Sequence, residues 1–329
     1  MSKLRIGVLG TARIGERRVV PAIQKSKNAV VTAVASRDGR HAQSCAERLN
    51  LPKAYASYEA LLADPDIDAV YVPLPNALHC EWTVKAAREG KHVLCEKPFA
   101  AGASEVDEMI AACEAHDVVL MEAFMYRFHP QNVKVRELIE FGAIGAVRMV
   151  RAAFCFTIGS ESNIRLNASL AGGSLMDVGS YCVNVARTMI GAEPDSVVAL
   201  AEMGAASGVD ETMGGVMRFP GGALGAFECS FRMPYRAGYE VIGERGRIEV
   251  VTPFITNNNE TLIVLHSPDD RAQTYGFPAV DQYTLMVEHF AECVMDRLPL
   301  RYPPAEGRAQ MRVIDALYES ARTGTVVRV

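Results

Sequence analysis

The stretch Leu4-Arg5-Ile6-Gly7-Val8-Leu9-Gly10-Thr11-Ala12-Arg13-Ile14-Gly15 decides the fold of the first part of the chain. Its apolar start is typical of a buried strand, and a glycine-containing turn follows directly. The turn matches the pattern Gly-x-Gly-x-x-Gly, except that Ala12 stands at the second glycine. Such a turn presents the amides of the next helix to the pyrophosphate of a dinucleotide, whereas a plain strand-to-helix turn is the alternative. The predicted phosphate-binding residues are Gly10, Thr11, Ala12, Arg13 and Ile14.

Short apolar runs alternate with helical stretches from residue 3 to about residue 122. The expected strands are residues 4–9, 29–35, 68–72, 92–95 and 118–121, and the expected helices lie near residues 15–26, 39–49, 57–63, 77–89 and 103–116. This alternation indicates βαβ units, and therefore a doubly wound parallel sheet. We assign residues 1–123 to this α/β domain.

The pattern changes after about residue 145 to longer strands with two-residue alternation. The expected strands are residues 212–219, 223–231, 239–242 and 247–251, with a turn at Gly221-Gly222. Helices at residues 130–141, 178–190, 282–296 and 305–322 are expected to cover one face. Residues 124–329 are therefore predicted to form an α+β domain with a large, mostly antiparallel open sheet. Because open sheet faces commonly pair, we expect a homo-dimer or homo-tetramer.

Composition narrows the class of partner. The 329 residues are 49% hydrophobic and 22% charged, which suffices for two cores. The net charge is −5 with scattered Lys and Arg, so we expect a small-molecule substrate and neither a nucleic acid nor a membrane. With no evident signal peptide, a cytoplasmic protein is expected. Eight cysteines without Cys-x-x-Cys spacing suit reduced core thiols, so no metal is predicted.

The second strand ends in Ser36-Arg37, where an acidic residue would read the ribose 2′-hydroxyl of NAD. A hydroxyl and a guanidinium suit a 2′-phosphate instead, and Arg13 or Arg40 could add charge. The residues therefore favour NADP as cofactor. The argument for NAD is Asp38, which follows Arg37 directly.

The segment Glu96-Lys97-Pro98 follows the apolar run His92-Val93-Leu94-Cys95. In doubly wound sheets ligands bind outside the carboxyl ends of the strands, so Lys97 is expected in the ligand crevice. Beside a cationic nicotinamide ring its ammonium form would be destabilised. Lys97, at a bend before a proline that permits a cis bond, is thus a candidate acid, base or electrostatic helper, whereas a surface lysine at a strand-to-loop turn is the alternative.

Asp177 and Tyr181 follow the glycine-rich segment Ala171-Gly172-Gly173-Ser174. They lie four residues apart, on one face of a predicted helix. A tyrosine near a lysine ammonium has its phenolate favoured, so it can exchange a proton with a substrate hydroxyl or carbonyl during hydride transfer. Tyr181 is therefore the acid-base candidate. Alternatively, Asp177 is a helix N-terminal acid and Tyr181 is core.

Five motifs in this order together resemble the Gfo/Idh/MocA oxidoreductase family over nearly the whole chain. They are residues 10–15, Pro73-Leu74-Pro75-Asn76-x-x-His79, Glu96-Lys97-Pro98, Met121-Glu122-Ala123-Phe124-Met125-Tyr126-Arg127-Phe128-His129-Pro130 and Asp177-Val178-Gly179-Ser180-Tyr181. Within the family the chain is similar to the group of NADP-dependent D-xylose dehydrogenases and dimeric trans-1,2-dihydrobenzene-1,2-diol dehydrogenases. This similarity rests on Tyr181, where inositol dehydrogenases have histidine, and on Asn163-Ile164-Arg165-Leu166.

The resemblance implies a Rossmann domain followed by an antiparallel-sheet domain, with Lys97 and Tyr181 as the catalytic pair beside Asp177. It further implies that Glu96 and Glu122 line the nicotinamide side and that Asn76 and His79 flank the ribose and pyrophosphate. The expected cofactor residues beyond the glycine turn are Ser36, Arg37, Leu74, Pro75, Asn76, His79, Glu96, Lys97, Glu122 and Arg127. Asn167 departs from the group, which often carries an acid there, and this leaves the substrate open.

The expected substrate contacts are Lys97, Arg127, Phe156, Arg165, Asp177 and Tyr181. Arg165 could instead anchor its loop by bonding backbone carbonyls, and Phe156 could be core. His129-Pro130 is expected to cap or start the following helix, and catalysis by His129 is the less favoured alternative.

The predicted activity is NADP-dependent hydride transfer to or from a sugar or other cyclic polyol, with oxidation at pyranose C1 favoured. A reductase of a keto-sugar, an anhydro-sugar or a nucleotide-linked keto-sugar is the alternative enzyme. A regulatory protein that binds dinucleotide without turnover is the alternative from another class. The sequence names neither the sugar nor the preferred direction.

Overall fold

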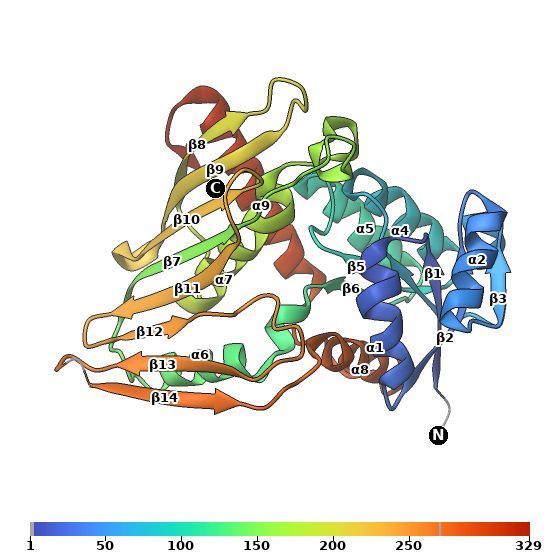
Figure 1. Ribbon diagram of the computed structural model, residues 1–329, viewed down its shortest axis with the longest axis horizontal. Coiled ribbons are helices and arrows are strands. Elements are labelled where there is room, and N and C mark those ends of the chain that lie inside the picture. The colour runs from blue at the N-terminus through green and yellow to red at the C-terminus, as the bar shows by residue number, and fades with distance from the viewer. Residues whose placement is uncertain (1–2, 270) are drawn as a thin grey trace. The chain divides into compact units, whose positions relative to one another are not determined.

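The computed structural model describes residues 3–269 and 271–329, which form two compact units (Figure 1). The first unit comprises the residues up to Met125 together with Asp281–Arg308. The second comprises Tyr126–Val280 and Ala309–Val329. The chain therefore returns to its first unit before it ends in the second.

The first unit contains a six-stranded sheet in the order β3-β2-β1-β4-β5-β6, and all its neighbouring strands are parallel. The strands are β1 (Leu4–Leu9), β2 (Ala29–Ala35), β3 (Lys53–Tyr55), β4 (Ala69–Val72), β5 (His92–Glu96) and β6 (Leu120–Ala123). This order confirms the predicted doubly wound sheet. It reverses direction at β1 and β4, where folds of this kind bind dinucleotides.

The helices of the first unit follow the predicted alternation. They are η1 (Gly15–Val19), α1 (Val20–Lys25), α2 (Gly39–Leu49), α3 (Tyr58–Leu62), α4 (His79–Arg88), α5 (Ala103–Ala115) and, from the returning segment, α8 (Gln282–Met295). The prediction that α8 covers the second sheet was wrong, because α8 contacts α1, β1 and β2. The Asn28 side-chain amide donates to the Glu288 carbonyl oxygen at 2.9 Å, which ties α8 to the start of β2.

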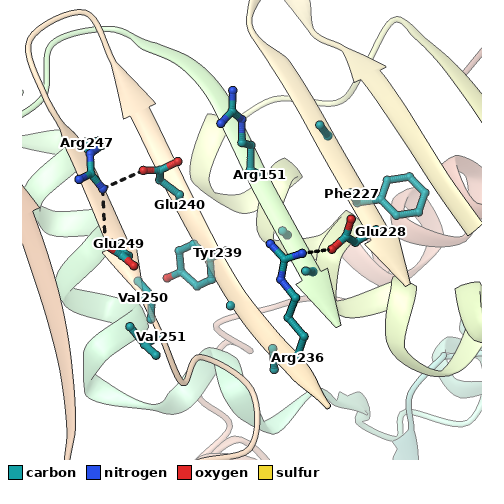
Figure 2. Close-up of a pocket in the computed structure, with 15 residues that line it drawn as sticks. Arg151, Phe227, Glu228, Arg236, Tyr239, Glu240, Arg247, Glu249, Val250 and Val251 are labelled. Atoms are coloured by element: carbon teal, nitrogen blue, oxygen red, sulfur yellow. Dashed lines mark hydrogen bonds and ion pairs between the residues drawn. The ribbon is translucent and has the colours of Figure 1, made fainter. Parts of the chain in front are cut away.

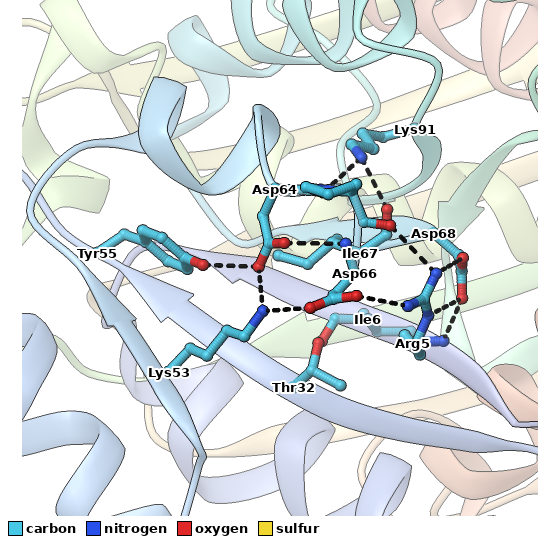
Figure 3. Close-up of polar contacts among 11 residues, drawn as sticks. Arg5, Ile6, Thr32, Lys53, Tyr55, Asp64, Asp66, Ile67, Asp68 and Lys91 are labelled. Carbon is cyan, nitrogen blue, oxygen red and sulfur yellow. Dashed lines mark hydrogen bonds and ion pairs between the residues drawn. The ribbon is translucent and has the colours of Figure 1, made fainter.

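A cluster of charged residues closes the amino-terminal edge of this sheet (Figure 3). Lys53 donates to Asp64 and Asp66 at 2.7 and 2.8 Å, and Arg5 donates to Asp68 at 2.7 Å. The Lys53 ammonium, together with the Tyr55 hydroxyl, holds the pKa of Asp64 well below its usual range. Lys91 donates to the carbonyl oxygens of Asp64 and Ile67, both at 2.8 Å. These contacts fix the amino-terminal edge of the sheet, opposite the carboxyl-terminal edge at which folds of this kind bind ligands.

The second unit contains a nine-stranded sheet in the order β14-β13-β12-β11-β7-β10-β9-β8-β15, in which only β7 and β10 pair in parallel among the described residues. The strands are β7 (Val147–Cys155), β8 (Ser196–Met203), β9 (Asp210–Arg218), β10 (Leu224–Ser230), β11 (Arg236–Gly243), β12 (Arg247–Val250), β13 (Thr261–His266), β14 (Ala272–Phe277) and β15 (Val327–Arg328). The prediction of a large, mostly antiparallel sheet is confirmed. The predicted turn at Gly221-Gly222 is also present, with positive φ at both residues.

Helices cover one face of the second sheet. They are α6 (Pro130–Glu140), α7 (Ser180–Ile190) and α9 (Pro304–Thr323). α7 contacts β7, β10 and β11, and α6 contacts β13. All eight cysteines are buried and free. Within residues 3–269 and 271–329 we find no helix with the length and hydropathy needed to cross a membrane.

Candidate active site

The turn after β1 leads directly from the strand into the first helical segment. Gly10 has a φ of +107°, and a Cβ there would lie 3.1 Å from Leu74 Cδ2. Its N–H donates to the Ala35 carbonyl oxygen at 2.8 Å, and the Ala12 carbonyl oxygen accepts from Glu16 N–H at 3.1 Å. The helical segment therefore begins directly after Ala12. The backbone N–H groups at its start point out of the end of the helix, toward the glycine turn. Glycine is required at residue 10, whereas the half-buried Ala12 is accommodated.

The end of β2 offers a hydroxyl and a guanidinium next to this turn. Ser36 is buried and Arg37 is exposed. Burial raises the pKa of the Tyr58 hydroxyl, and the neighbouring Arg37 guanidinium counteracts the shift. The Tyr58 hydroxyl oxygen would lie 3.7 Å from a Cβ on Gly10. Tyr58, which the sequence analysis missed, thus joins Arg37 to the glycine turn.

Asp38, the residue that favoured NAD, caps helix α2. Its carboxylate accepts from Arg40 N–H at 2.8 Å. Its own N–H donates to the Ser36 hydroxyl at 3.3 Å. Since the carboxylate stabilises a helix N-terminus, its engagement with a ribose would cost the helix its cap.

His79 braces two loops of the first unit. Its ring is fully buried, with Nδ1 2.9 Å from the Pro98 carbonyl oxygen and Nε2 2.8 Å from the Leu74 carbonyl oxygen. Burial lowers the pKa of His79. The ring therefore links the Leu74-Pro75 segment to the Lys97-Pro98 turn, and its predicted contact with a cofactor stays a prediction. Asn76 and Pro75, next to it in the chain, are half-buried.

Lys97 lies half-buried at the carboxyl end of β5, and its peptide bond to Pro98 is cis. The preceding Glu96 is buried and accepts from the Tyr71 hydroxyl at 2.6 Å and from Lys97 N–H at 3.3 Å. Burial raises the pKa of Glu96, the Lys97 ammonium counteracts this, and the charge of Glu122 adds to it. Glu122 lies on β6, whose pairing places it beside Cys95. The structure thus brings Glu96, Lys97 and Glu122 together at the predicted ligand-binding edge.

In the second unit Arg165 pairs with Asp177. Arg165 Nε donates to Asp177 Oδ2 at 2.5 Å. The two residues come from different segments: Arg165 from the turn η4 (Ile164–Leu166) and Asp177 from the π-helical turn η6 (Leu175–Gly179). Arg165 therefore bonds a carboxylate of this chain. The sequence analysis had expected either a substrate or backbone carbonyls as its partner.

Tyr181 is held by three aromatic rings. It is only 4% exposed, and its ring centroid lies 5.1 Å from that of Phe254, 5.3 Å from that of Phe154 and 5.7 Å from that of Tyr126. Phe156 lies beyond the end of β7 and packs edge-on against Phe231 at 5.3 Å. Phe154, which the sequence analysis did not select, is thus the β7 aromatic in contact with Tyr181.

Asn184, also missed, is the hub of a buried polar network. Its Oδ1 accepts from the Tyr126 hydroxyl at 2.6 Å and from Arg127 Nε at 2.9 Å, and its Nδ2 donates to Gln310 at 3.3 Å. Gln310 in turn donates to the Ser180 carbonyl oxygen at 2.7 Å. Arg127 is buried within this network. The only signal in the sequence is that Asn184 lies three residues after Tyr181, on the same helix face.

His129 caps α6 as predicted. Its Nδ1 accepts from Gln131 N–H at 3.2 Å, and Pro130 is the first residue of the helix. The ring is fully buried, and burial lowers the pKa of His129 to about 4. His129 therefore serves the fold.

A hollow lined by both charged and apolar residues lies on the face of the second sheet opposite α7 (Figure 2). Arg236 pairs with Glu228, and Arg247 donates to Glu240 at 2.9 Å. Arg151, from β7, stands beside these pairs. Its lining carries charges of both signs among apolar side chains, which suits another protein surface better than an enclosed small molecule.

Two family models match the chain. The model described as "Oxidoreductase family, NAD-binding Rossmann fold" matches residues 4–124, and "GFO/IDH/MocA C-terminal domain" matches residues 132–249. The chain is 43% identical over 325 residues to D-xylose 1-dehydrogenase (NADP(+)) 2 of Haloferax volcanii, covering 98% of this chain and 99% of that protein.

Two solved structures have the same fold over nearly their full length. The aldose-aldose oxidoreductase of Caulobacter crescentus, complexed with glycerol, gives a TM-score of 0.92 at 30% identity and covers 99% of this chain and 100% of its own. KijD10, a 3-ketoreductase of Actinomadura kijaniata in complex with NADP and TDP-benzene, gives 0.92 at 31% identity, with 97% and 98% covered.

Proposed function

The chain belongs to the Gfo/Idh/MocA oxidoreductase family, and from this premise we propose that it transfers hydride between NADP and a sugar or other cyclic polyol. Oxidation of a pyranose at C1 is the favoured reaction. The observation that carries the proposal is the Lys97 turn at the carboxyl end of β5, with Glu96 and Glu122 beside it, in a sheet of dinucleotide-binding order. The 43% identity to a D-xylose dehydrogenase supports a sugar substrate.

The residues expected near the ribose 2′ position of the cofactor suit NADP. The Arg37 guanidinium and the Ser36 hydroxyl offer hydrogen bonds to a 2′-phosphate, while the Asp38 carboxylate is engaged as a helix cap. The Haloferax relative is named for NADP(+), and KijD10 was solved with NADP. The residues proposed to hold the cofactor are the turn Gly10–Ile14 with Ser36, Arg37, Leu74, Pro75, Asn76, His79, Glu96, Lys97, Glu122 and Arg127.

The two domains divide the work in this proposal. Residues 1–123, together with Arg127, bind the cofactor, which supplies the carbon that accepts or releases hydride, and residues 124–329 bind the substrate. Arg127, Phe156, Arg165 and Asp177 are the proposed substrate contacts in the second domain. In oxidation the Tyr181 phenolate accepts the hydroxyl proton while the hydrogen on the same carbon leaves with its electron pair, so that a carbonyl forms. The Lys97 ammonium stabilises the negative phenolate oxygen of Tyr181 during this exchange.

The proposal is tested by following absorbance at 340 nm with a panel of substrates. Pentoses, hexoses, inositols and dihydrodiols are supplied with NADP, and keto-sugars with NADPH, with NAD and NADH in parallel. We expect NADPH formation with an aldopyranose. No turnover across the panel in a preparation that binds NADPH tightly would contradict the proposal and favour a regulatory protein.

A second candidate is reduction of a keto-sugar, including a nucleotide-linked one. It is supported by the similarity to KijD10, which is described as a 3-ketoreductase and was solved with TDP-benzene. The same proton-transfer residues would serve it in the reverse direction. NADPH consumption by a nucleotide-linked keto-sugar, without NADPH formation from free sugars, would select this candidate.

We also propose that the second sheet pairs with a second copy of the chain. The row Val198, Val216, Ala226, Arg151, Glu240 and Glu249 crosses β8, β9, β10, β7, β11 and β12 as direct cross-strand neighbours. Such neighbours point to one face of a sheet, so this row is apolar at one end and charged with both signs at the other. A surface of this kind can complement a second copy of itself across a two-fold axis.

A further inference from the structure

A buried carboxylate lies beneath the turn that leads to Asp177 and Tyr181. Asp210, the first residue of β9, is 1% exposed. Its Oδ2 accepts from the Ser174 hydroxyl and from Leu175 N–H, both at 2.7 Å. Its Oδ1 accepts from the Tyr318 hydroxyl of α9 at 2.8 Å. One carboxylate therefore joins β9, the glycine-rich turn and α9.

The glycine-rich turn is shaped to admit this carboxylate. Gly173 has a φ of +124°, and a Cβ there would overlap the Asp210 carboxylate and lie 2.8 Å from the Tyr318 hydroxyl oxygen. Gly173 N–H donates to the Arg165 carbonyl oxygen at 2.9 Å. The turn thus packs against Asp210 on one side and holds the Arg165 segment on the other.

The same turn fixes the start of the helical segment that carries Asp177 and Tyr181. Asp177 N–H donates to the Gly173 carbonyl oxygen at 3.0 Å, and the Asp177 carboxylate pairs with Arg165. Tyr181 follows one turn later, held by the rings of Phe154 and Phe254. Displacement of the turn would therefore move Asp177, Arg165 and Tyr181 together.

We propose that Asp210 is a positioning residue for proton transfer, because it anchors the turn from which Arg165, Asp177 and Tyr181 take their places. This inference rests on the proposed function. Asp210 does not touch the substrate; it acts through the backbone of Gly173, Ser174 and Leu175. Each of these hydrogen bonds helps to hold the turn in place, and a misplacement of about 1 Å in a catalytic group can cost about 10²-fold in rate.

The test compares Asp210→Ala with Asp210→Asn, using the panel sugar that gives the highest rate. Asp210→Ala is expected to lower kcat by about 10²-fold and to leave the NADPH dissociation constant within about twofold. In Asp210→Asn the amide oxygen still accepts from Ser174 and Leu175, and the amide N–H₂ donates to the Tyr318 oxygen. That variant is expected to recover most of the rate, to within about fivefold of the wild type.

Ser320→Ala is the matched control, since Ser320 is also buried, accepts from Ala199 N–H and donates to the Thr325 carbonyl oxygen. It is expected to lower the melting temperature and leave kcat unchanged. If Asp210→Ala does not fold, Tyr318→Phe replaces it, with an expected fall in kcat of about fivefold. The inference is overturned if Ser320→Ala lowers kcat as much as Asp210→Ala does, or as much as Tyr318→Phe where that variant is used. A structural role alone would then explain the loss of rate.

Tyr181→Phe separates this inference from the proposed function. The double variant Asp210→Ala/Tyr181→Phe is expected to be no slower than Tyr181→Phe alone, since a positioning residue acts through the group it positions. Independent, multiplied losses would overturn the inference while the proposed function stands. A normal rate in Tyr181→Phe would instead remove the acid-base assignment, and the inference with it.

Discussion

At the scale of single residues, the proposed chemistry depends on how neighbours hold a few polar side chains. Glu96 is fixed by the Tyr71 hydroxyl, Tyr181 by aromatic rings and Arg127 by Asn184. The motifs identified Glu96, Lys97, Arg127 and Tyr181 as candidates from the sequence. Their supporting partners come from distant segments, and no local pattern reveals which buried asparagine or phenylalanine will meet them.

Replacement of Lys97 by methionine removes the ammonium and keeps an unbranched side chain. We expect kcat to fall by about 10²-fold or more, because the negative oxygen loses its cationic neighbour, while NADPH binding is largely retained. Steady-state rates and a fluorescence titration of NADPH measure the two quantities. Lys85→Met is the control, since Lys85 pairs with Glu81 on the surface of α4. Near-normal turnover in Lys97→Met would remove the assigned role.

His129 predicts a dependence of stability on pH. Its pKa of about 4 in the folded state lies below the value of about 6.5 for an unfolded chain, so the folded state binds fewer protons between these values. The stability it contributes is fully present above about pH 6.5 and is lost as the pH falls through 4, by up to about 3 kcal/mol. Asparagine at this position still accepts the capping hydrogen bond but does not titrate.

Urea unfolding at pH 7 and pH 4.5 checks this prediction. The midpoint of His129→Asn is expected to fall less on acidification than that of the wild type. His116→Asn, which changes an exposed histidine, should follow the wild type. An unchanged pH dependence in His129→Asn would show that burial of His129 does not drive the acid sensitivity.

At the scale of elements, the strand and helix alternation of the first unit followed directly from the sequence, because parallel strands buried on both faces are continuous apolar runs. β3 was missed because three residues give no periodicity, and β6 begins two residues later than the predicted run at 118–121. The location of α8 also escaped prediction, since an amphipathic pattern shows that a face is buried but not which sheet buries it.

The junction of β2 and α2 predicts cofactor preference. Arg37→Ala is expected to weaken NADPH binding by about tenfold and leave NADH binding unchanged, because only NADPH carries the 2′-phosphate. Fluorescence titration of both cofactors measures the effect. Arg88→Ala, at an exposed position at the end of α4, should change neither. Equal weakening of both cofactors would place Arg37 away from the 2′ position.

At the scale of the whole molecule, the predictions of a Gfo/Idh/MocA oxidoreductase with a parallel and a mostly antiparallel sheet are confirmed. The return of Asp281–Arg308 to the first unit was not foreseen, because residues distant along the chain give no local signal of their contact. The assignment of one domain to the cofactor and one to the substrate remains a proposal.

The proposed self-association of the whole molecule depends on exposed apolar side chains of β8 and β9. Leu200 is 74% exposed on β8, beside the exposed Val198 and Val216. Leu200→Asp is expected to convert the proposed oligomer to a monomer in size-exclusion chromatography with light scattering, because a charge would be buried without a partner. Leu298→Asp, at an exposed site of the first unit, is the control and should leave the mass unchanged. A monomeric wild-type protein would refute the proposed pairing.

The most direct test of the account is the transfer of deuterium from D-xylose labelled at C1 to NADP. We predict that mass spectrometry finds the label in NADPH and that Tyr181→Phe slows its appearance by about 10²-fold. Formation of unlabelled NADPH would contradict oxidation at C1. Absence of any NADPH from xylose and the other aldopyranoses, in protein that binds NADPH, would contradict the proposed activity.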